Sequence, residues 1–499
     1  MSPKPLLDIG DAEWTIVEAI LQRHVPGREV WAFGSRARWT AKEFSDLDLF
    51  IQGEQPLAGE DAAALAEAFA ESDLPWKVDV VDGATVSAAF REVIERDKVV
   101  VQWTVCKNAN VDEGGFKWRD CTLGEFVRLQ RGHDLTASEQ QSGNIPIMGS
   151  AGPNGTHNKA LASGPGVAIG RSGASAGRVH FSEVDYWPHN TCLYVTDFLG
   201  ANPRFAYYLL QTLDLAAFNS GSAQASLNRN FLYSIPLKVP QRSEQNSIVE
   251  VLQAFDDRIA LLRETNATLE AMAQALFKSW FVDFDPVRAK MEGRVPEGMD
   301  EATAALFPDE FEETGLGKIP KGWHCTRLDQ FLELAYGKAL KAGDRVVGEV
   351  PVYGSGGETG WHNECLVQGP SVIIGRKGTV GSLYWEDRPF FPIDTVFYIR
   401  TSIPMTYCFY LLQTLGLSEM NTDAAVPGLN RGNVYRLTVP FADTAVLEAF
   451  DNIVGSIRKR MFNNNQQIQL LSTLRDTLLP RLISGQLRLP EAMKEVAAA

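Results

Sequence analysis

Three acidic residues near the start of the chain have the types and spacing of a metal site. Asp46 and Asp48 alternate in an apolar run, so both carboxylates lie on one face of the expected strand. Asp79 lies in a second apolar run and can join them. Three converging carboxylates can bind Mg²⁺, and Gly34-Ser35 can offer amide and hydroxyl groups to nucleotide phosphates. The spacing therefore makes Asp46, Asp48 and Asp79 candidate metal-binding residues, and Gly34 and Ser35 candidate contacts for a nucleotide.

Two glycine-rich polar segments later in the chain carry basic residues between strand-like runs. They read Gly170-Arg-Ser-Gly-Ala-Ser-Ala-Gly-Arg178 and Gly375-Arg-Lys-Gly-Thr-Val-Gly-Ser382. Arginine can contact guanine edges or phosphate, and glycine lets backbone amides approach closely. The alternative is that the glycines form hairpin turns and the arginines are merely solvated. Two Leu-Asn-Arg segments add to this set, and the candidate DNA-binding residues are Arg171, Arg178, Asn228, Arg229, Arg376, Lys377, Asn430 and Arg431.

The elements that hold these basic residues form an internal repeat of about 200 residues. Several segments recur in the same order. The matched pairs are Trp118 with Trp323, Gly132 with Gly337, Ile145–Ser150 with Val350–Ser355, Val167–Arg171 with Val372–Arg376, Tyr208–Leu213 with Tyr410–Leu415, and Leu227–Arg229 with Leu429–Arg431. Each copy ends in a short strand-like run closed by Pro240 or Pro440. The chain therefore contains two copies of one α/β module.

A long helix is expected after each module. From Ile248 to Trp280 apolar residues recur in alternating steps of four and three, which is a heptad seam, and the same alternation runs from Leu447 to Leu471. Asn266 and Asn464 lie on the seams, where a polar group costs stability but penalises wrong registers. Two helices of matched length favour an antiparallel coiled coil that acts as a spacer. The alternative is that each helix packs only on its own module.

These elements predict a multidomain α/β protein. The expected boundaries are 1–110 for a small N-terminal α/β domain, 113–241 for the first module, 242–285 for the first helix, 286–318 for a linker, 319–441 for the second module, 442–486 for the second helix and 487–499 for a tail. The linker contains three prolines and an acidic patch, and we expect it to be ordered in patches. It would carry the chain back to the other end of the helical spacer.

Composition and charge narrow the function classes. With 499 residues, 45% of them hydrophobic, the chain can bury several cores. Its net charge of −15 argues against nucleic acid overall, but the acid is concentrated in residues 1–110, which hold 19 Asp and Glu against 11 Lys and Arg. The six cysteines are scattered, which fits reduced thiols, and no apolar stretch is long enough to cross a bilayer. The first residues do not resemble a signal peptide, so a cytoplasmic location is expected.

A rigid rod with a similar reader at each end suits a ligand that repeats its features at a fixed distance. Duplex DNA is such a ligand, because the spacing of its half-sites mirrors the pseudo-symmetry of the protein that binds it. The repeat and the two helices therefore predict a DNA-binding protein.

This layout resembles the specificity subunits of type I restriction–modification enzymes. The resemblance also rests on the module endings, on Leu276-Phe-Lys-Ser-Trp-Phe-Val-Asp-Phe-Asp-Pro286 and on Leu479-Pro-Arg-Leu-Ile-Ser-Gly485, and it covers roughly residues 113–486. It implies two target-recognition domains that read the halves of a split site in double-stranded DNA, with a gap set by the paired helices. The implied partners are two methyltransferase subunits, which bring S-adenosylmethionine and methylate an adenine in each half-site, and translocase–nuclease subunits, which use ATP and Mg²⁺. The specificity core itself is expected to need no cofactor.

Residues 10–105 closely resemble the minimal nucleotidyltransferase family, down to the spacing between Gly-Ser and Asp-x-Asp. The resemblance implies that Asp46 and Asp48 bind Mg²⁺ and that Asp79 is a third ligand or a base. A nucleoside monophosphate would then pass to a hydroxyl of a protein or nucleic acid. Trp39 departs from the family, which usually has a small residue there, and this indole could crowd the loop near the nucleotide. The alternative is a fold retained without activity, as a docking or regulatory element.

Three readings of the whole chain follow. The first is a DNA specificity subunit that directs adenine methylation or restriction by its partners. The second is a nucleotidyltransferase that the repeated modules deliver to DNA. The third is a stand-alone DNA-binding or scaffolding protein of antiviral defence that uses neither chemistry.

Overall fold

The computed structural model describes residues 7–26, 28–42, 45–53, 56–87, 90–91, 94, 98–102, 118–218, 226–420 and 428–489. The end of the expected N-terminal domain and the last ten residues of the expected tail lie outside these ranges, as does Cys106. The chain divides into two compact units, residues 1–253 with 474–499, and residues 254–473.

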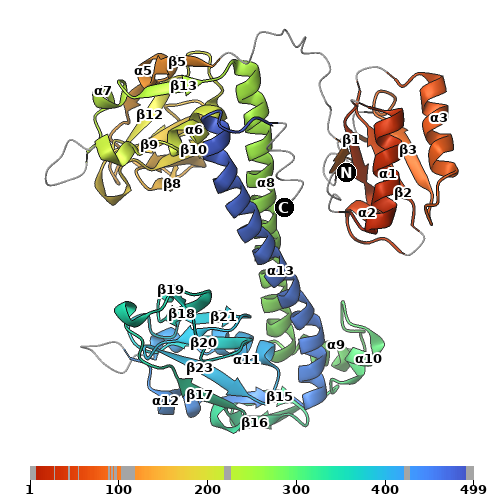
Figure 1. Ribbon diagram of the computed structural model, residues 1–499. Helices are drawn as coiled ribbons and strands as arrows, with labels where there is room; N and C mark the ends of the chain where they lie inside the picture. The colour runs from red at the N-terminus through yellow and green to blue at the C-terminus, as the bar shows by residue number, and fades with distance from the viewer. Residues whose placement is uncertain are drawn as a thin grey trace. The chain divides into compact units, whose positions relative to one another are not determined.

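The N-terminal domain is built on a four-stranded sheet in the order β3-β2-β1-β4 (Figure 1). The strands are β1 (Val30–Phe33), β2 (Leu47–Ile51), β3 (Val78–Asp82) and β4 (Val99–Gln102), and the helices are α1 (Asp11–His24), α2 (Gly34–Ala37) and α3 (Gly59–Ala70). Strands β2 and β3 are parallel, and the other pairs are antiparallel. Leu47, Leu49 and Ile51 of β2 are fully buried among side chains from α1 and α3, so this core fixes the strand that carries Asp48.

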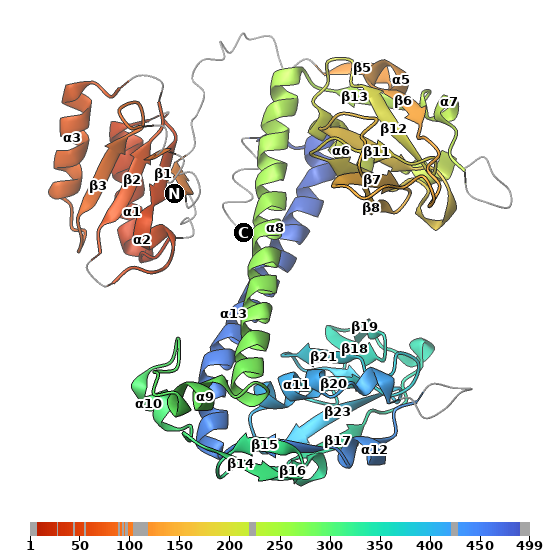
Figure 2. The ribbon, with the colours of Figure 1, turned by 180° about the vertical axis from the view of Figure 1, so that it is seen from behind.

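The first module contains a four-stranded sheet, a three-stranded sheet and a two-stranded ribbon. The large sheet has the order β10-β9-β12-β6, from β6 (Arg128–Arg131), β9 (Gly166–Gly170), β10 (Val179–Ser182) and β12 (Cys192–Asp197). The small sheet has the order β11-β7-β8, from β7 (Ile145–Gly149), β8 (Gly152–His157) and β11 (Trp187–Pro188), and the ribbon pairs β5 (Arg119–Thr122) with β13 (Pro236–Val239). The helices are α5 (Leu123–Phe126), α6 (Pro203–Gln211) and α7 (Arg229–Leu232). Helix α6 packs on β9 and β10 (Figure 1), and the view from behind labels the small-sheet strands β7, β8 and β11 (Figure 2).

The second module repeats this architecture strand by strand. Its large sheet has the order β17-β23-β20-β21, from β17 (Leu332–Tyr336), β20 (Ser371–Gly375), β21 (Leu383–Glu386) and β23 (Val396–Thr401). Its small sheet is β19-β18-β22, from β18 (Val350–Gly354), β19 (Gly357–His362) and β22 (Phe391–Pro392), and its ribbon pairs β16 (His324–Arg327) with β24 (Thr438–Phe441). Helix α11 (Met405–Thr414) packs on β20 and β21, and α12 (Arg431–Tyr435) corresponds to α7. The predicted repeat is confirmed.

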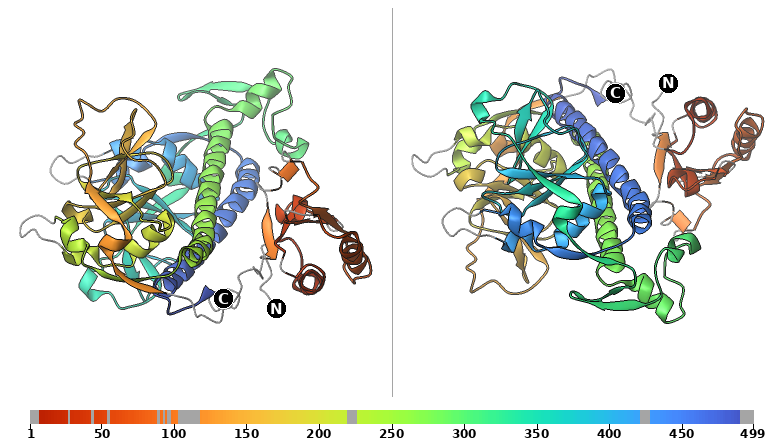
Figure 3. Two further views of the ribbon diagram at one scale, coloured as in Figure 1. Left: turned by 90° about the horizontal axis from the view of Figure 1, so that it is seen from above. Right: turned by 90° about the horizontal axis from the view of Figure 1, so that it is seen from below.

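Two helices of 40 residues follow the modules, α8 (Arg242–Phe281) and α13 (Thr444–Ile483). They lie side by side in the views from above and below (Figure 3). Asn266 bonds to Asn464 and Asn465, whereas Glu270, farther along α8, bonds to Arg458, earlier along α13. The pairing is therefore antiparallel, as the heptad seams predicted. Asn464 is 1% exposed, and its amide donates to Asn266 Oδ1 at 2.8 Å, so a satisfied polar pair fixes the register.

The segment expected to be a linker is more structured than predicted. It contains α9 (Asp285–Met291), α10 (Glu301–Ala305) and an antiparallel hairpin of β14 (Phe311–Thr314) and β15 (Gly317–Pro320). Its apolar side chains enter the core of the second module, where Phe284, Phe307 and Ile319 are buried with Trp280 and Trp323. The segment therefore packs against both the end of α8 and the second module.

Two further observations concern the described residues alone. The five cysteines among them form no disulfide bond with one another. None of the helices described has both the length and the apolar composition that spanning a lipid bilayer requires.

Candidate functional site

The structure brings the predicted basic residues of the first module to one place. The backbone of Arg171, just after β9, accepts a hydrogen bond from Leu227 at 2.8 Å, so the Asn228-Arg229 turn lies beside it. Ser172 and Ser226 extend this contact as an isolated β-bridge. Gly170 donates to the carbonyl of Arg178 at 2.7 Å, which closes the glycine-rich loop over the end of the strand. One loop and one helical turn thus form a single edge of the sheet.

The second module makes the same arrangement with its own residues. Leu429 donates to the carbonyl of Arg376 at 2.8 Å, and Lys377 forms a β-bridge with Gly428. The Asn430-Arg431 turn therefore lies beside the Gly-Arg loop, as in the first module. The repeat preserves this juxtaposition as well as the sheets.

Several of these polar side chains stabilise the module to which they belong. Asn228 Oδ1 accepts from the backbone of Asn230 at 3.0 Å and caps α7, and Asn430 Oδ1 caps α12 in the same way through Gly432 at 2.8 Å. Capping of this kind contributes about 1 kcal/mol to a helix.

The arginines beside these caps also have partners in the backbone. Arg229 donates to the carbonyl of Leu129 at 3.1 Å, and Arg431 donates to that of Leu334 at 3.5 Å. The guanidinium groups of Arg171 and Arg376 reach the carbonyls of Asn190 and Asp394 at 3.5 and 3.2 Å. Their contact with DNA stays a prediction, as it does for the exposed Arg178 and Lys377.

In the N-terminal domain the strand register brings two of the three carboxylates together. Asp48 on β2 pairs with Asp79 on the parallel strand β3 and with Phe33 on β1. Gly34, the next residue, has a φ of +76°, and a Cβ there would lie 2.2 Å from Asp48 Oδ2. Only glycine fits both the backbone angle and the approach of the carboxylate. Asp46 lies just before β2 and is exposed.

Asp48 has two carboxylates and one guanidinium as its charged neighbours. Burial raises the pKa of Asp48, and the carboxylates of Asp79 and Asp46 raise it further, against a smaller lowering by Arg38. Asp79 also forms an ion pair with Lys77. Carboxylates that repel one another in this way have the hard oxygen donors that Mg²⁺ prefers.

A complete metal cage is nevertheless not preformed. Within the described ranges no three His, Cys, Asp or Glu side chains group closely enough to make one. Asp48 and Asp79 would be the residues to hold a cation, with Asp46 joining them. The three-carboxylate site therefore stays a prediction.

Trp39 has an unusual backbone conformation. Its φ is +59°, in the left-handed region that glycine adopts without strain, and its indole is 54% exposed. The backbone therefore supplies a physical reason for a small residue at this position.

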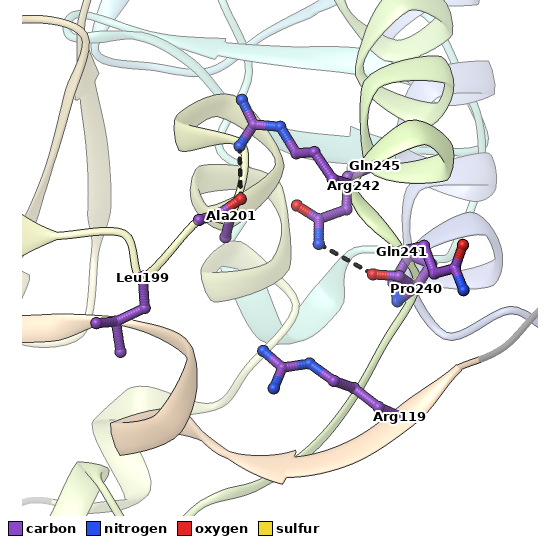
Figure 4. Close-up of a pocket in the computed structure, with 8 residues that line it drawn as sticks. Arg119, Leu199, Ala201, Pro240, Gln241, Arg242 and Gln245 are labelled. Atoms are coloured by element: carbon purple, nitrogen blue, oxygen red, sulfur yellow. Dashed lines mark hydrogen bonds between the residues drawn. The ribbon is translucent and has the colours of Figure 1, made fainter.

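A pocket that we did not predict lies where the first module joins α8 (Figure 4). It is lined by Arg119, Leu199, Gly200, Ala201, Pro240, Gln241, Arg242 and Gln245. Arg242 donates to the carbonyl of Gly200 at 3.2 Å, and Gln245 donates to that of Pro240 at 3.0 Å. Its residues come from three separate segments, so no local pattern marks it. These two hydrogen bonds join the start of α8 to the first module.

Comparison with known proteins identifies both parts of the chain. The family model of the type I restriction modification DNA specificity domain matches residues 116–271 and 320–441, and that of the nucleotidyltransferase domain matches residues 15–110. The N-terminal part is 54% identical over 96 residues to the probable protein adenylyltransferase MntA of Haemophilus influenzae. That match covers 19% of this chain and 84% of the relative.

Two specificity subunits are similar to a larger part of the chain. The type I restriction enzyme HindI specificity subunit of Haemophilus influenzae is 27% identical over 325 residues, covering 51% of this chain and 69% of the relative. The MjaIX specificity subunit of Methanocaldococcus jannaschii is 25% identical over 326 residues, covering 58% and 71%. The crystal structure of the type I restriction–modification S subunit from M. genitalium has the same fold, with a TM-score of 0.52, 18% identity, and coverage of 74% of this chain and 97% of that one.

Proposed function

The chain belongs to the family of type I restriction modification DNA specificity domains, and on this premise we propose that it reads a split DNA site, one half with each module, and directs adenine methylation or restriction by partner subunits. The observation that carries the proposal is the repeat itself. Two modules with the same strand order each continue into a helix of 40 residues, and the two helices pair antiparallel. A pair of similar readers on one spacer matches a ligand with two half-sites.

The proposed partners follow from the same premise. Double-stranded DNA binds the modules, and two methyltransferase subunits and the translocase–nuclease subunits assemble with the chain. S-adenosylmethionine, ATP and Mg²⁺ belong to those partners, and this chain binds the DNA site and directs the partners to it. In each module, the edge formed by the Gly-Arg loop and the Asn-Arg turn would face DNA.

The experiment that tests the proposal is adenine-methylation mapping in cells that express this chain with the neighbouring methyltransferase subunit. A split methylated motif that disappears when this chain is omitted is the expected result. No new methylation, with the methyltransferase subunit shown to be bound to this chain, would reject the proposal.

A second activity is proposed for the N-terminal part, since residues 15–110 match the nucleotidyltransferase domain family. The positive φ of Gly34 lets Asp48 lie against the backbone of the Gly-Ser turn, where nucleotide phosphates would bind. Asp46 and Asp48 would hold Mg²⁺, which supplies charge neutralisation when bound, and Asp79 would complete the site or accept the proton of the attacking hydroxyl. The acceptor is a hydroxyl of a protein or nucleic acid, whose oxygen forms a bond to the α-phosphorus of the nucleoside triphosphate while pyrophosphate leaves.

ATP labelled at its α-phosphate tests this second proposal. The full chain with Mg²⁺ should transfer label to an acceptor in its complex, and Asp48→Asn should abolish the transfer. Glu60→Gln, on the exposed start of α3, is the matched control and should retain it. Equal labelling by the Asp48→Asn variant would exclude this site.

A further inference from the structure

One surface position differs between the two modules although its backbone setting is the same. Arg131 at the end of β6 pairs with Leu193, which pairs in turn with Ile169 of β9. Tyr336 at the end of β17 pairs with Phe397, which pairs with Ile374 of β20. The register of three strands therefore makes Arg131 and Tyr336 equivalent.

The residue after each of them holds the backbone in place. A Cβ on Gly132 would lie 2.1 Å from the carbonyl oxygen of His189, and a Cβ on Gly337 would lie 2.1 Å from that of Ile393. No other residue type fits at either glycine without backbone movement. Because both modules have this close approach, the two positions present their side chains from the same backbone, and only the side chains differ.

Both side chains lie beside the basic edge of their module. The ring centre of Tyr336 is 5.3 Å from the guanidinium carbon of Arg376 and 5.1 Å from that of Arg431, and the residue is 49% exposed. The tyrosine thus stands between the Gly-Arg loop and the Asn-Arg turn.

Arg131 reaches the corresponding edge of the first module. It is exposed, and its Nη2 lies 3.8 Å from Asp134, which accepts from Asn190. Asn190 in turn accepts from Arg171 of the Gly-Arg loop. Both partners of the Arg131 ion pair are solvent-exposed, so its loss changes the folding equilibrium by at most about fivefold. The guanidinium is therefore free to exchange its partner for a base.

The residues that both modules share cannot distinguish two half-sites. The Leu-Asn-Arg segments and the Gly-Arg pair of each loop are the same in both copies, and their arginines donate to backbone carbonyls of the module in both. The remaining loop residues differ. Position 131/336 lies among them and carries a guanidinium in one module and a phenol in the other. Arginine can donate two hydrogen bonds to O6 and N7 of guanine, whereas an aromatic ring makes apolar contact with the methyl group of thymine.

We propose that Arg131 and Tyr336 are specificity-determining residues, Arg131 reading a guanine in the half-site of the first module and Tyr336 making an apolar contact with a thymine in that of the second. The inference rests on the proposed function in DNA recognition. It assigns to each residue one base pair of its own half-site, and the shared arginines hold the surrounding backbone.

Methylation mapping with the assembled complex tests this assignment. Arg131→Tyr should change the preferred base at one position of one half-site and leave the other half-site and the gap unaltered. Tyr336→Arg should change one position of the opposite half-site. Arg128→Tyr, three residues earlier on β6 and also exposed, is the matched control and should leave the motif unchanged. An unchanged motif in both test variants, or the same change in the control, would overturn the inference.

A conservative variant covers the case in which a larger change disturbs assembly. Arg131→Lys keeps the charge but lacks the rigid planar fork of the guanidinium, so discrimination for guanine at that position should fall about tenfold, with little change at other positions. Retained discrimination would overturn the assignment of Arg131. A wild-type complex that methylates no split motif would instead contradict the proposed function, so the two failures are distinguishable.

Discussion

Arg458 of α13 donates to Glu270 of α8 at 2.8 Å, although 188 residues separate them in the chain. Tyr410 of α11 donates to the same carboxylate at 3.2 Å, and the guanidinium carbon of Arg458 lies 4.6 Å from the ring centre of Trp385 and 5.0 Å from that of Phe409. One arginine side chain, 12% exposed, therefore joins both helices to the second module. Burial also raises the pKa of Tyr410 to about 12, so its hydroxyl remains a donor at neutral pH.

Replacing this arginine should loosen the second module. Arg458→Ala leaves Glu270 without its charged partner in a partly buried setting, and such losses cost about 2–4 kcal/mol after allowance for partial exposure. Calorimetry of the full chain should show one transition shifted down by several degrees. Lys459→Ala, next along the helix and exposed, is the control and should change stability by less than about 0.5 kcal/mol. Equal effects of the two changes would refute the coupling role of Arg458.

A buried hydroxyl in the first module has no partner among the described residues. Tyr186 is fully buried, and its hydroxyl oxygen makes no hydrogen bond with the described residues. The second module has Phe390 at the equivalent place. Tyr186→Phe should therefore be neutral or stabilising by up to about 1 kcal/mol.

Tyr353→Phe is the contrasting change. It removes a 2.8 Å hydrogen bond to Glu386 in the core of the second module and should cost about 1–3 kcal/mol. Thermal unfolding of the two variants checks both signs. Destabilisation by Tyr186→Phe would mean that its hydroxyl does have a partner.

The left-handed backbone of Trp39 predicts a stabilising substitution. Trp39→Gly removes the clash of Cβ with the backbone and should stabilise the N-terminal domain by about 1 kcal/mol, since the exposed indole contributes little burial. Calorimetry of the full chain should show one transition moved to higher temperature in this variant, and that transition is the unfolding of the N-terminal domain. Trp39→Ala, which retains a Cβ, should not give the same gain.

The carboxylate of Asp48 predicts a pH dependence. Its pKa is raised in the folded domain by burial and by Asp79 and Asp46, so the folded state binds a proton more tightly than the unfolded state. Stability from this group is therefore present at low pH and is lost as the pH rises through the raised pKa. Asp48→Asn should stabilise the domain at neutral pH, and its advantage should shrink as the pH falls through the carboxylate range. A stability difference that does not vary with pH would contradict this electrostatic origin.

The sequence was sufficient for the repeat, the paired helices and the position of the basic loops. These features depend on periodicity and on glycine spacing, which short-range physics determines. Residues 286–318 were predicted to be a linker ordered in patches because of their prolines and acidic residues, and their packing into the core of the second module was not predicted. Val287, Phe307 and Phe311 were the available sign of burial.

Side-chain roles were harder to predict than backbone positions. An asparagine in a Leu-Asn-Arg segment is equally consistent with DNA contact and with a helix cap, and only the bond from Asn228 to the backbone of Asn230 distinguishes a cap. In the same way, the sequence placed Asp48 and Asp79 in strands but could not give their parallel register. The matched glycines Gly132 and Gly337 already align Arg131 with Tyr336 in the sequence, but only the structure shows that both side chains lie beside the basic edge of their module.

Shortening the helical pair tests its role as a spacer. Removal of residues 258–264 from α8 and 466–472 from α13 keeps the heptad seam and the Asn266–Asn464 pair, because seven residues are close to two full turns. Each helix becomes about 10 Å shorter, which corresponds to about three base pairs of DNA. Methylation mapping should then show both half-sites unaltered and a gap shorter by about three base pairs. Removing residues 258–264 alone mismatches the two seams and should abolish methylation. If the double deletion leaves the gap at its original length, the helices do not set the spacing.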